Sequence, residues 1–329
     1  MTSRLLVPGL FVLLGAAGPS SAPERAPAPE ISPRKRDTVQ RRQVVQSPRP
    51  AAPSARPSPR RPAPGLQRCE VLIPQLDARL PFGPGEELGF VISLSGVYVG
   101  RASLTLGERS SHGSHVVYPA YGQASTNSFF TKMSKMESQQ TSLVTPDGVF
   151  PLLMQSHARA ETLTRQEEVR FDPGQHRAMA SLRMEGTSSS QQRRDWKGEA
   201  QGGQAVQDVV SIVYFARSRQ VQPGASYCTE IYYGKRLWVV RGQVGEAESV
   251  STPAGPYRAM PVRGEAVREG EPRYARQFTV WLTDDEDRLP VRLVSPTAYG
   301  EIEVRIDQFR RGRRLVREAQ VAQQQPLRQ

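Results

Sequence analysis

Side chains that could perform catalysis are few in this sequence, and none of them forms a familiar catalytic pattern. Two of the four histidines, His112 and His115, lie in a Ser- and Gly-rich turn without a carboxylate beside them, so we interpret them as solvated loop residues. The nucleophile elbow Gly-x-Ser-x-Gly, the metalloprotease sequence His-Glu-x-x-His and the phosphate-binding Walker sequence do not occur. The remaining candidates for acid–base chemistry on sugars are Glu167, Glu168, Glu269, Glu271 and His157. The sequence therefore favours a protein that is not an enzyme, with a hydrolase of envelope polymers as an alternative.

The sharpest local charge is the acidic run Asp284–Asp287. It lacks the glycine and the longer ligand spacing of a calcium loop, so we expect a hairpin turn whose carboxylates are solvated or paired with Arg288 and Arg292. The two cysteines and the scattered histidines do not make up a zinc site. We therefore predict neither a metal ion nor another cofactor.

Cys69 and Cys228 are the two cysteines of the chain, one at the start of the expected domain and one deep in its second half. In an oxidising compartment they could form a disulfide that closes a long loop, worth about 4 kcal/mol in the chain-entropy model. Two unpaired thiols are the alternative, because sequence alone does not give the separation of the Cα atoms. Both interpretations stay open at this point.

Aromatic residues gather in the second half of the chain, where they could fill a sheet core or line an apolar pocket. Strands favour aromatic side chains, which supports the core, whereas a curved sheet could present some of them in a concave binding site. The group consists of Tyr227, Tyr232, Tyr233, Trp238, Tyr257, Tyr274, Phe278 and Trp281. Our candidate ligand-binding residues are Trp238, Tyr257 and Trp281.

Alternation of apolar and polar residues predicts strands through most of residues 66–309. Residues 88–94 and 97–106 alternate on either side of Ser95–Gly96, which is typical of a hairpin. Residues 301–307 alternate charged and aliphatic side chains, which indicates one wet and one buried face.

One segment has helical spacing instead. Val206, Val209, Val210 and Val213 fall on one face of a helix, with Asp208 near its start, which predicts an amphipathic helix from residue 204 to about 217. We therefore expect a mainly β fold for residues 66–309: a curved antiparallel sheet or partly open barrel with one packed α-helix.

The two ends of the chain differ from this domain. Residues 1–17 combine a basic residue, an apolar stretch and a small-residue cleavage site, the pattern of a secretory signal peptide. Residues 18–65 are rich in Pro and Arg, which predicts a disordered linker, and we expect the basic, Gln-rich residues 310–329 to form a disordered tail. No other apolar run approaches the roughly 20 residues of a membrane span. We therefore expect a periplasmic or otherwise exported protein without a transmembrane segment.

The net charge of +12 belongs almost entirely to these two segments. Residues 18–65 hold ten basic residues against three acidic ones, and the last twenty residues hold six arginines against one glutamate. The segments could act as solvated spacers or contact an anionic surface such as lipopolysaccharide or an acidic wall polymer. Nucleic acid is disfavoured as a partner, because the arginines are not interleaved with aromatic side chains.

Four motifs, in order along the chain, resemble a bacterial family. They are residues 96–104 (GVYVGRASL), 207–217 (QDVVSIVYFAR), 250–257 (VSTPAGPY), and 280–285 with 289–293 (VWLTDD and LPVRL). Over about residues 85–310 the chain is similar to the family catalogued as domain of unknown function 3108. The resemblance implies an exported, β-rich protein of Gram-negative-type cells, with a sheet that resembles the curved half-barrels of periplasmic lipoprotein carriers. It implies no established reaction and transfers no catalytic residue.

The leading functional hypothesis is a non-enzymatic envelope protein. Its curved sheet would bind an apolar or amphiphilic ligand, such as a lipid, or an envelope protein. The alternative is a structural or assembly module that pairs with another envelope protein along a sheet edge.

Overall fold

The computed structural model describes Cys69 and residues 79–127, 135–160, 163–186, 194–202, 206–219, 221–271 and 274–315. Within these ranges the chain forms seventeen strands and one short helix, α3 (Ser211–Arg217). This confirms the predicted fold class, a mainly β protein with a curved, largely antiparallel sheet and one packed helix. The predicted signal peptide (1–17), the predicted linker (18–65) and residues 316–329 of the predicted tail lie outside the described residues.

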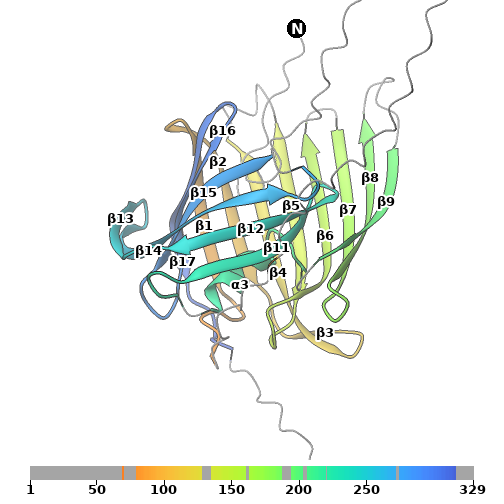
Figure 1. The fold of residues 1–329 in the computed structure, drawn as a ribbon, viewed down its shortest axis with the longest axis horizontal. Helices are drawn as coiled ribbons and strands as arrows, with labels where there is room; N and C mark the ends of the chain where they lie inside the picture. Colours follow the sequence, from red (N-terminus) through yellow and green to blue (C-terminus); the bar gives the residue numbers. More distant parts are fainter. Residues whose placement is uncertain are drawn as a thin grey trace, which may run out of the picture. The chain divides into compact units, whose positions relative to one another are not determined.

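The strands follow one another mostly as antiparallel hairpins (Figure 1). Those of the first half are β1 (Glu87–Leu94), β2 (Val97–Leu106), β3 (Ser110–His112), β4 (His115–Thr126), β5 (Met136–Val144), β6 (Pro151–Ala160), β7 (Leu163–Asp172), β8 (Arg177–Gly186) and β9 (Arg194–Gln201). Those of the second half are β10 (Val206–Gln207), β11 (Ser226–Tyr233), β12 (Arg236–Val244), β13 (Glu248–Thr252), β14 (Gly255–Arg268), β15 (Ala275–Thr283), β16 (Pro290–Thr297) and β17 (Gly300–Arg310). The predicted hairpin at Ser95–Gly96 joins β1 to β2, and both turn residues have positive φ (48° and 81°), the conformation of tight hairpin turns.

Hydrogen bonds link these strands into one open sheet. From β9 the pairing runs through β8, β7, β6, β5 and β4 to β2 and β1, crosses to β17, and continues through β16, β15, β14 and β12 to β11. These pairings are antiparallel, whereas the short β10 pairs with β11 in parallel. In the described part of the chain β9 pairs with neither β10 nor β11, so the sheet is not closed.

The two ends of the sheet overlap face to face. On one face of the β11–β12 hairpin, Tyr232 packs with Val169 and other apolar residues on the inner face of β6–β8. On the other face, Ile231 packs with Val209, which immediately precedes the α3 region. Figure 1 accordingly shows β11 and β12 crossing in front of the strands of the first half. The sheet therefore curls until its second end lies against the inner side of its first.

Helix α3 is shorter than the helix predicted from the valine spacing. It begins at Ser211, not near residue 204, because Val206–Gln207 forms β10. The carboxylate of Asp208 accepts hydrogen bonds from the backbone N–H groups of Val210 and Ser211 (2.8 and 2.9 Å). These bonds satisfy the N–H groups that a helix start leaves unpaired. The predicted C-terminal end at Arg217 agrees with the structure.

The main hydrophobic core surrounds α3. Val210, Tyr214 and Phe215 contribute to it from the helix region, together with Phe90 of β1 and Ile306 of β17. The alternating positions of the first and last long strands thus face the helix, as their period-two pattern predicts. The core positions α3 inside the concave side of the sheet.

The first residues of the predicted C-terminal tail belong to the fold. β17 extends to Arg310, and the chain beyond it hydrogen bonds with residues that precede β1. The backbone N–H of Leu80 donates to the carbonyl oxygen of Leu315 (2.9 Å), and Leu315 donates to Phe82 (3.0 Å). Residues 310–315 are therefore an ordered extension of the domain that was expected to end at 309.

Candidate functional site

An apolar cavity of about 180 Å³ lies between α3 and the concave face of the sheet. Ile212 and Val213 line it from the helix, while Ile231, Ala266 and Val280 line it from β11, β14 and β15. A cavity of about 150 Å³ with a similar lining is large enough to hold benzene. This cavity can therefore accommodate a benzene-sized group or a short stretch of alkyl chain.

The period-two pattern explains how the sheet supplies this lining. On β15, Phe278, Val280 and Leu282 line the cavity, whereas Trp281 between them does not. The cross-strand partner of Val280 is Leu293, which continues the apolar wall onto β16. The alternation that is visible in the sequence thus builds one continuous wall.

The three aromatic residues predicted to bind a ligand do not line this cavity. Trp238 is 3% exposed, and its indole N–H donates to a backbone carbonyl at 3.3 Å. Trp281 is 8% exposed, and its indole N–H donates to the carboxylate of Glu248 at 2.6 Å. Tyr257 is half-buried against the main core, and desolvation, aided by the charge of Asp285, raises the pKa of its phenol. The structure places all three in packing positions, and the cavity lining is largely aliphatic.

Asp208 holds the start of α3 and connects it to β5. Besides its bonds to the helix N–H groups, its carboxylate accepts hydrogen bonds from the side chains of Gln140 (3.0 Å) and Ser142 (2.6 Å). The side chain is fully buried, and desolvation raises the pKa of the carboxyl above its usual value although these hydrogen bonds oppose the shift. An Asp before a helical pattern is a readable helix-start signal, but nothing local in the sequence indicates its bonds to β5.

Arg217 holds the other end of α3 in a buried ion pair. Its Nη1 and Nη2 donate to the two carboxylate oxygens of Glu86 (2.6 and 2.9 Å), and both side chains are fully buried. Its Nε donates to the backbone carbonyl of Asp287 (3.1 Å), and its guanidinium lies 5.4 Å from the centre of the Phe82 ring. This pair was not singled out from the sequence, because its members are 131 residues apart and no local pattern links them.

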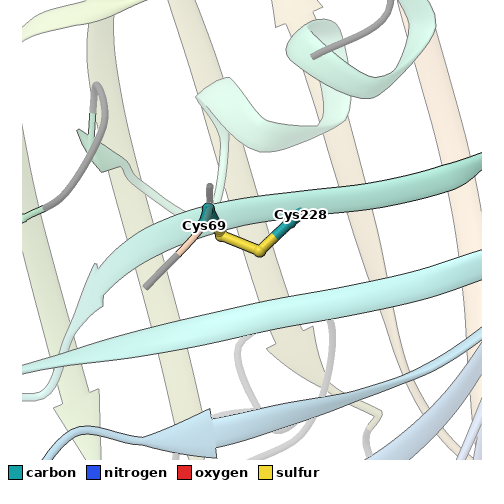
Figure 2. Close-up of a disulfide and its surroundings, with 2 residues drawn as sticks. All are labelled: Cys69 and Cys228. Carbon is teal, nitrogen blue, oxygen red and sulfur yellow. A yellow bond between two sulfur atoms is a disulfide. The ribbon is translucent and has the colours of Figure 1, made fainter. Parts of the chain in front are cut away.

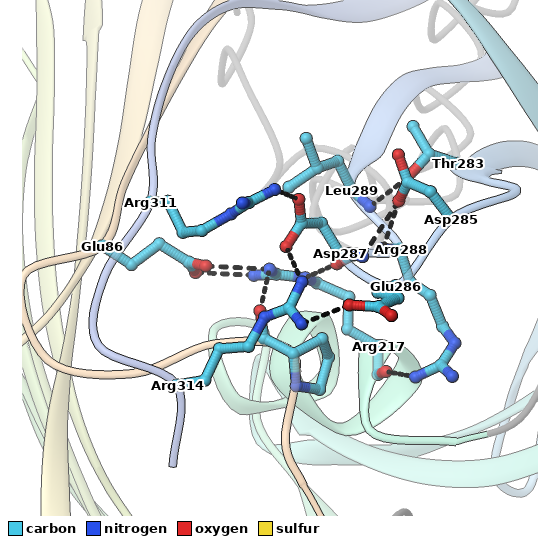
Figure 3. Close-up of polar contacts among 11 residues, drawn as sticks. Glu86, Arg217, Thr283, Asp285, Glu286, Asp287, Arg288, Leu289, Arg311 and Arg314 are labelled. Carbon is cyan, nitrogen blue, oxygen red and sulfur yellow. Dashed lines mark hydrogen bonds and ion pairs between the residues drawn. The ribbon is translucent and has the colours of Figure 1, made fainter.

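The acidic run forms the predicted turn between β15 and β16, and two of its carboxylates pair with arginines of the C-terminal segment that were not predicted as partners (Figure 3). Asp287 pairs with Arg311 and Arg314, and Glu286 also pairs with Arg314. Of the two expected arginines, Arg292 pairs with Glu303 instead (2.7 Å). Arg288 contacts the run through its backbone N–H, which donates to the carboxylate of Asp285 (3.1 Å), while its side chain donates to the backbone carbonyl of Arg217 (3.0 Å). The long-range return of the C-terminal segment, which the sequence does not reveal, brings the two arginines to the turn.

Cys69 and Cys228 form a disulfide, with their Cα atoms 5.4 Å apart (Figure 2). Cys228 lies on β11 and is one of the residues that line the apolar cavity. The bond therefore ties residue 69 to the strand that forms one wall of the cavity. A disulfide between residues 159 positions apart restricts the unfolded chain and stabilises the fold by about 5 kcal/mol in the chain-entropy model.

The carboxylates proposed for sugar hydrolysis do not face one another across a common site. Glu167 is buried on the inner face of β7, where it pairs with Arg165 (2.6 Å), whereas Glu168 faces the outer side and accepts a hydrogen bond from Gln155 (3.1 Å). Neighbouring residues of a strand point to opposite faces, so these two cannot flank one glycosidic bond. His157 is exposed on β6 on the outer side.

The other candidate residues lie apart from the cavity. Glu271 pairs with Arg268 (3.4 Å) in the connection after β14, which also contains Glu269. His112 and His115 are exposed cross-strand partners at the β3–β4 turn, in agreement with their interpretation as solvated residues. In the described ranges, no three His, Cys, Asp or Glu side chains are grouped so that they could hold a metal ion. No helix in those ranges has the length and apolar character to cross a membrane.

The solved structures that are similar to this chain include three bacterial proteins with low sequence identity. A β-barrel-like protein of the DUF1849 domain family from Brucella abortus is 10% identical with a TM-score of 0.44, covering 70% of this chain and 99% of its own. A Bacteroides fragilis protein described as exported, with a YmcC-like fold, is 9% identical with a TM-score of 0.32, covering 71% and 99%. A Parabacteroides distasonis protein described as a lipoprotein is 9% identical with a TM-score of 0.27, covering 71% and 100%. No curated protein matches the chain.

The family comparison is more direct. The model described as "Protein of unknown function (DUF3108)" matches residues 90–307, which run from β1 to β17 and include α3 and the walls of the cavity. The resemblance seen in the sequence motifs is confirmed: the chain belongs to the DUF3108 family of proteins of unknown function.

Proposed function

We propose that this protein is an exported, non-enzymatic protein of the cell envelope that binds an apolar ligand, or the apolar part of an amphiphile, beside α3. The observation that carries the proposal is the cavity of about 180 Å³ and its largely aliphatic lining. Transfer of an apolar group from water into such a space is favourable by about 0.8 kcal/mol for each buried methylene group. The signal-peptide pattern and the Cys69–Cys228 disulfide support an oxidising, exported location.

The size of the cavity defines what it can hold. About 180 Å³ accommodates a short stretch of alkyl chain and not a complete lipid, so the rest of a larger ligand would extend beyond the cavity. Polar lining groups such as the Thr229 hydroxyl are few, so the cavity selects for apolar character and length.

A series of n-alcohols of increasing chain length tests this proposal in the full chain by calorimetric titration. Affinity should rise about fourfold per added methylene group until the cavity is filled, and then level off. Ala266 is buried and lines the cavity, so Ala266→Leu should make affinity level off at a shorter chain. The matched variant Ala200→Leu, on β9 outside the cavity, should leave the series unchanged.

Affinity that does not depend on chain length, or an identical series in the Ala266→Leu protein, would contradict the proposal. The unfolding midpoint of each variant, measured in the same buffer, shows that the comparison is made on folded protein.

A further inference from the structure

A second hollow, of about 730 Å³, crosses the outer face of β5–β9. Its walls are two rows of cross-strand partners whose side chains alternate with the inward-facing Gln140, Glu167 and Leu182. One row contains Gln139, His157, Gln166 and Arg183, and the other contains Thr141, Gln155, Glu168, Ser181 and Lys197. With neighbouring strands about 4.8 Å apart, the groove between the rows is about 19 Å long across five strands.

The walls of this groove are made of amide, hydroxyl and charged side chains. Gln139, Gln155 and Gln166 each present a planar group with both a donor and an acceptor, and Thr141 and Ser181 add hydroxyls. An apolar partner would bury these groups without hydrogen bonds, which is unfavourable for each of them. The groove therefore fits an extended partner that carries many hydroxyl and amide groups of its own.

Charge in the groove excludes a strong polyanion as its partner. Glu168 accepts hydrogen bonds from Gln155 (3.1 Å) and Arg170 (3.2 Å), and the two cationic side chains of the walls are Arg183 and Lys197. Arg170 is paired with Glu168, and the two further cations of the walls are too few to neutralise a run of phosphates. A neutral or weakly acidic polymer is the better match.

One end of the groove continues onto an exposed aromatic ring. Tyr121 of β4 is the cross-strand partner of Thr141 and is 42% exposed. It extends the second row by one strand, and an exposed ring face can pack against the apolar face of a flat partner while its hydroxyl stays in water. Sugar rings have this combination of an apolar face and a hydroxyl-rich edge.

We propose that this groove is a binding site for an N-acetylated glycan strand that lies across β5–β9. The glutamine amides would pair with acetamido and hydroxyl groups, and Tyr121 would pack against a sugar ring at the β4 end. The site binds without cleaving, since the second carboxylate of the pair, Glu167, faces the interior. It is separate from the apolar cavity, so either site can exist without the other.

Calorimetric titration of the full chain with chitotetraose tests this proposal. The wild-type protein should bind, and Gln155→Ala combined with Gln166→Ala should weaken binding by about tenfold or more through lost hydrogen bonds. Ser181→Trp should weaken it by filling the groove. Gln277→Ala is the matched control, because Gln277 is also an exposed strand glutamine bonded to a glutamate (3.3 Å to Glu265) but lies on β15.

Several outcomes would overturn the proposal. These are no binding of chitotetraose, equal binding by wild type and both groove variants, or a loss in the Gln277→Ala control as large as in the groove variants. Equal affinity for cellotetraose, which lacks acetamido groups, would overturn the assignment to N-acetylated glycans. The alcohol series in the same variants should be unchanged, so failure of this site is distinguishable from failure of the apolar cavity.

Discussion

Asp208 couples the apolar cavity to the first half of the sheet through one buried carboxylate. It accepts hydrogen bonds from the first N–H groups of the α3 region and from Gln140 and Ser142 on β5. Val209 and Ile212, which follow it closely, line the cavity. The position of the cavity wall that Val209 and Ile212 form therefore depends on the hydrogen bonds of the Asp208 carboxylate.

Replacing this carboxylate by its neutral isostere should remove a pH dependence of stability. Because the pKa of Asp208 is raised in the folded state, its contribution to stability is complete below its ordinary pKa of 3.8 and is lost as pH rises through the raised value. Asp208→Asn keeps an acceptor for the helix N–H groups and an amide that can donate to Ser142. Urea unfolding from about pH 4 to pH 8 should show the variant gaining stability relative to wild type as pH rises.

The Asp208→Ala protein is the comparison for this prediction. It leaves buried donors without an acceptor and should be destabilised by about 3 kcal/mol or more across the same pH range. If the difference between the Asn variant and wild type does not change with pH, the proposed raised pKa of Asp208 is wrong.

Aromatic character locates the cavity only in part. Tyr227 and Phe278 of the predicted aromatic group line it, whereas the indole N–H groups of Trp238 and Trp281 are bonded to Tyr233 and Glu248 in buried positions. Most of the remaining lining is aliphatic and comes from α3 and several strands, with Ala266 among these residues. Which side chains face one another across the cavity depends on the pairing of distant strands, so no single residue type indicates it.

The C-terminal segment, residues 311–315, lies beside the C-terminal end of α3 and is connected to it through Asp287. Residues 311–315 hydrogen bond with residues before β1 and bring Arg311 and Arg314 to Asp287, whose backbone carbonyl also binds Arg217. Burial, the largest single effect, opposes ionisation of Asp287, but the hydrogen bonds and charges of the two arginines outweigh it and lower its pKa. The segment thus neutralises a largely buried carboxylate beside the helix end.

Removing both arginines should destabilise the fold near neutral pH. Arg311→Ala combined with Arg314→Ala leaves Asp287, which is 5% exposed, without its cationic partners, and we expect a loss of about 1–3 kcal/mol in urea unfolding. Since the pKa of Asp287 is lowered in the folded state, ionised Asp287 contributes to the free energy of unfolding above its ordinary pKa of 3.8. This contribution is lost as pH falls through the lowered value. The difference from wild type should therefore shrink below about pH 3.

Arg313→Ala is the matched control within the same segment. Its partner Glu108 is largely exposed, so this change should alter stability by less than about 0.5 kcal/mol. Equal losses in the double variant and the control would mean that Asp287 does not depend on these two arginines.

The sequence predicts which strands and helix form better than it predicts the residues at which they begin and end. Alternation located the hairpin at Ser95–Gly96 and the strand at 301–307, because side chains of one strand face follow from local spacing alone. The helix was predicted seven residues too long at its start, since Val206 has the right spacing but pairs with β11. The tail was predicted to begin at 310, because charge and composition do not show that residues 311–315 pair with residues near 80.

The two ends of the open sheet pack against each other face to face: the β11–β12 hairpin lies on the inner face of β6–β8. The β11–β12 hairpin is buried on both faces, with Tyr232 on one side and Ile231 on the other. This overlap leaves the apolar cavity beside α3 and keeps the polar outer face of β5–β9 free of the core. Composition and periodicity predict a curved sheet, but the pairing of β1 with β17 and the overlap join residues too far apart for sequence patterns to reveal.

Native mass spectrometry of the full chain, purified from the periplasm of a Gram-negative host, tests whether the cavity beside α3 holds a ligand. We expect an additional mass of one apolar or amphiphilic molecule per chain, recovered by organic extraction and reduced in the Ala266→Leu protein but retained in Ala200→Leu. A chain that carries no such molecule, and that also binds no member of the alcohol series, would contradict the assignment of the cavity as a ligand site.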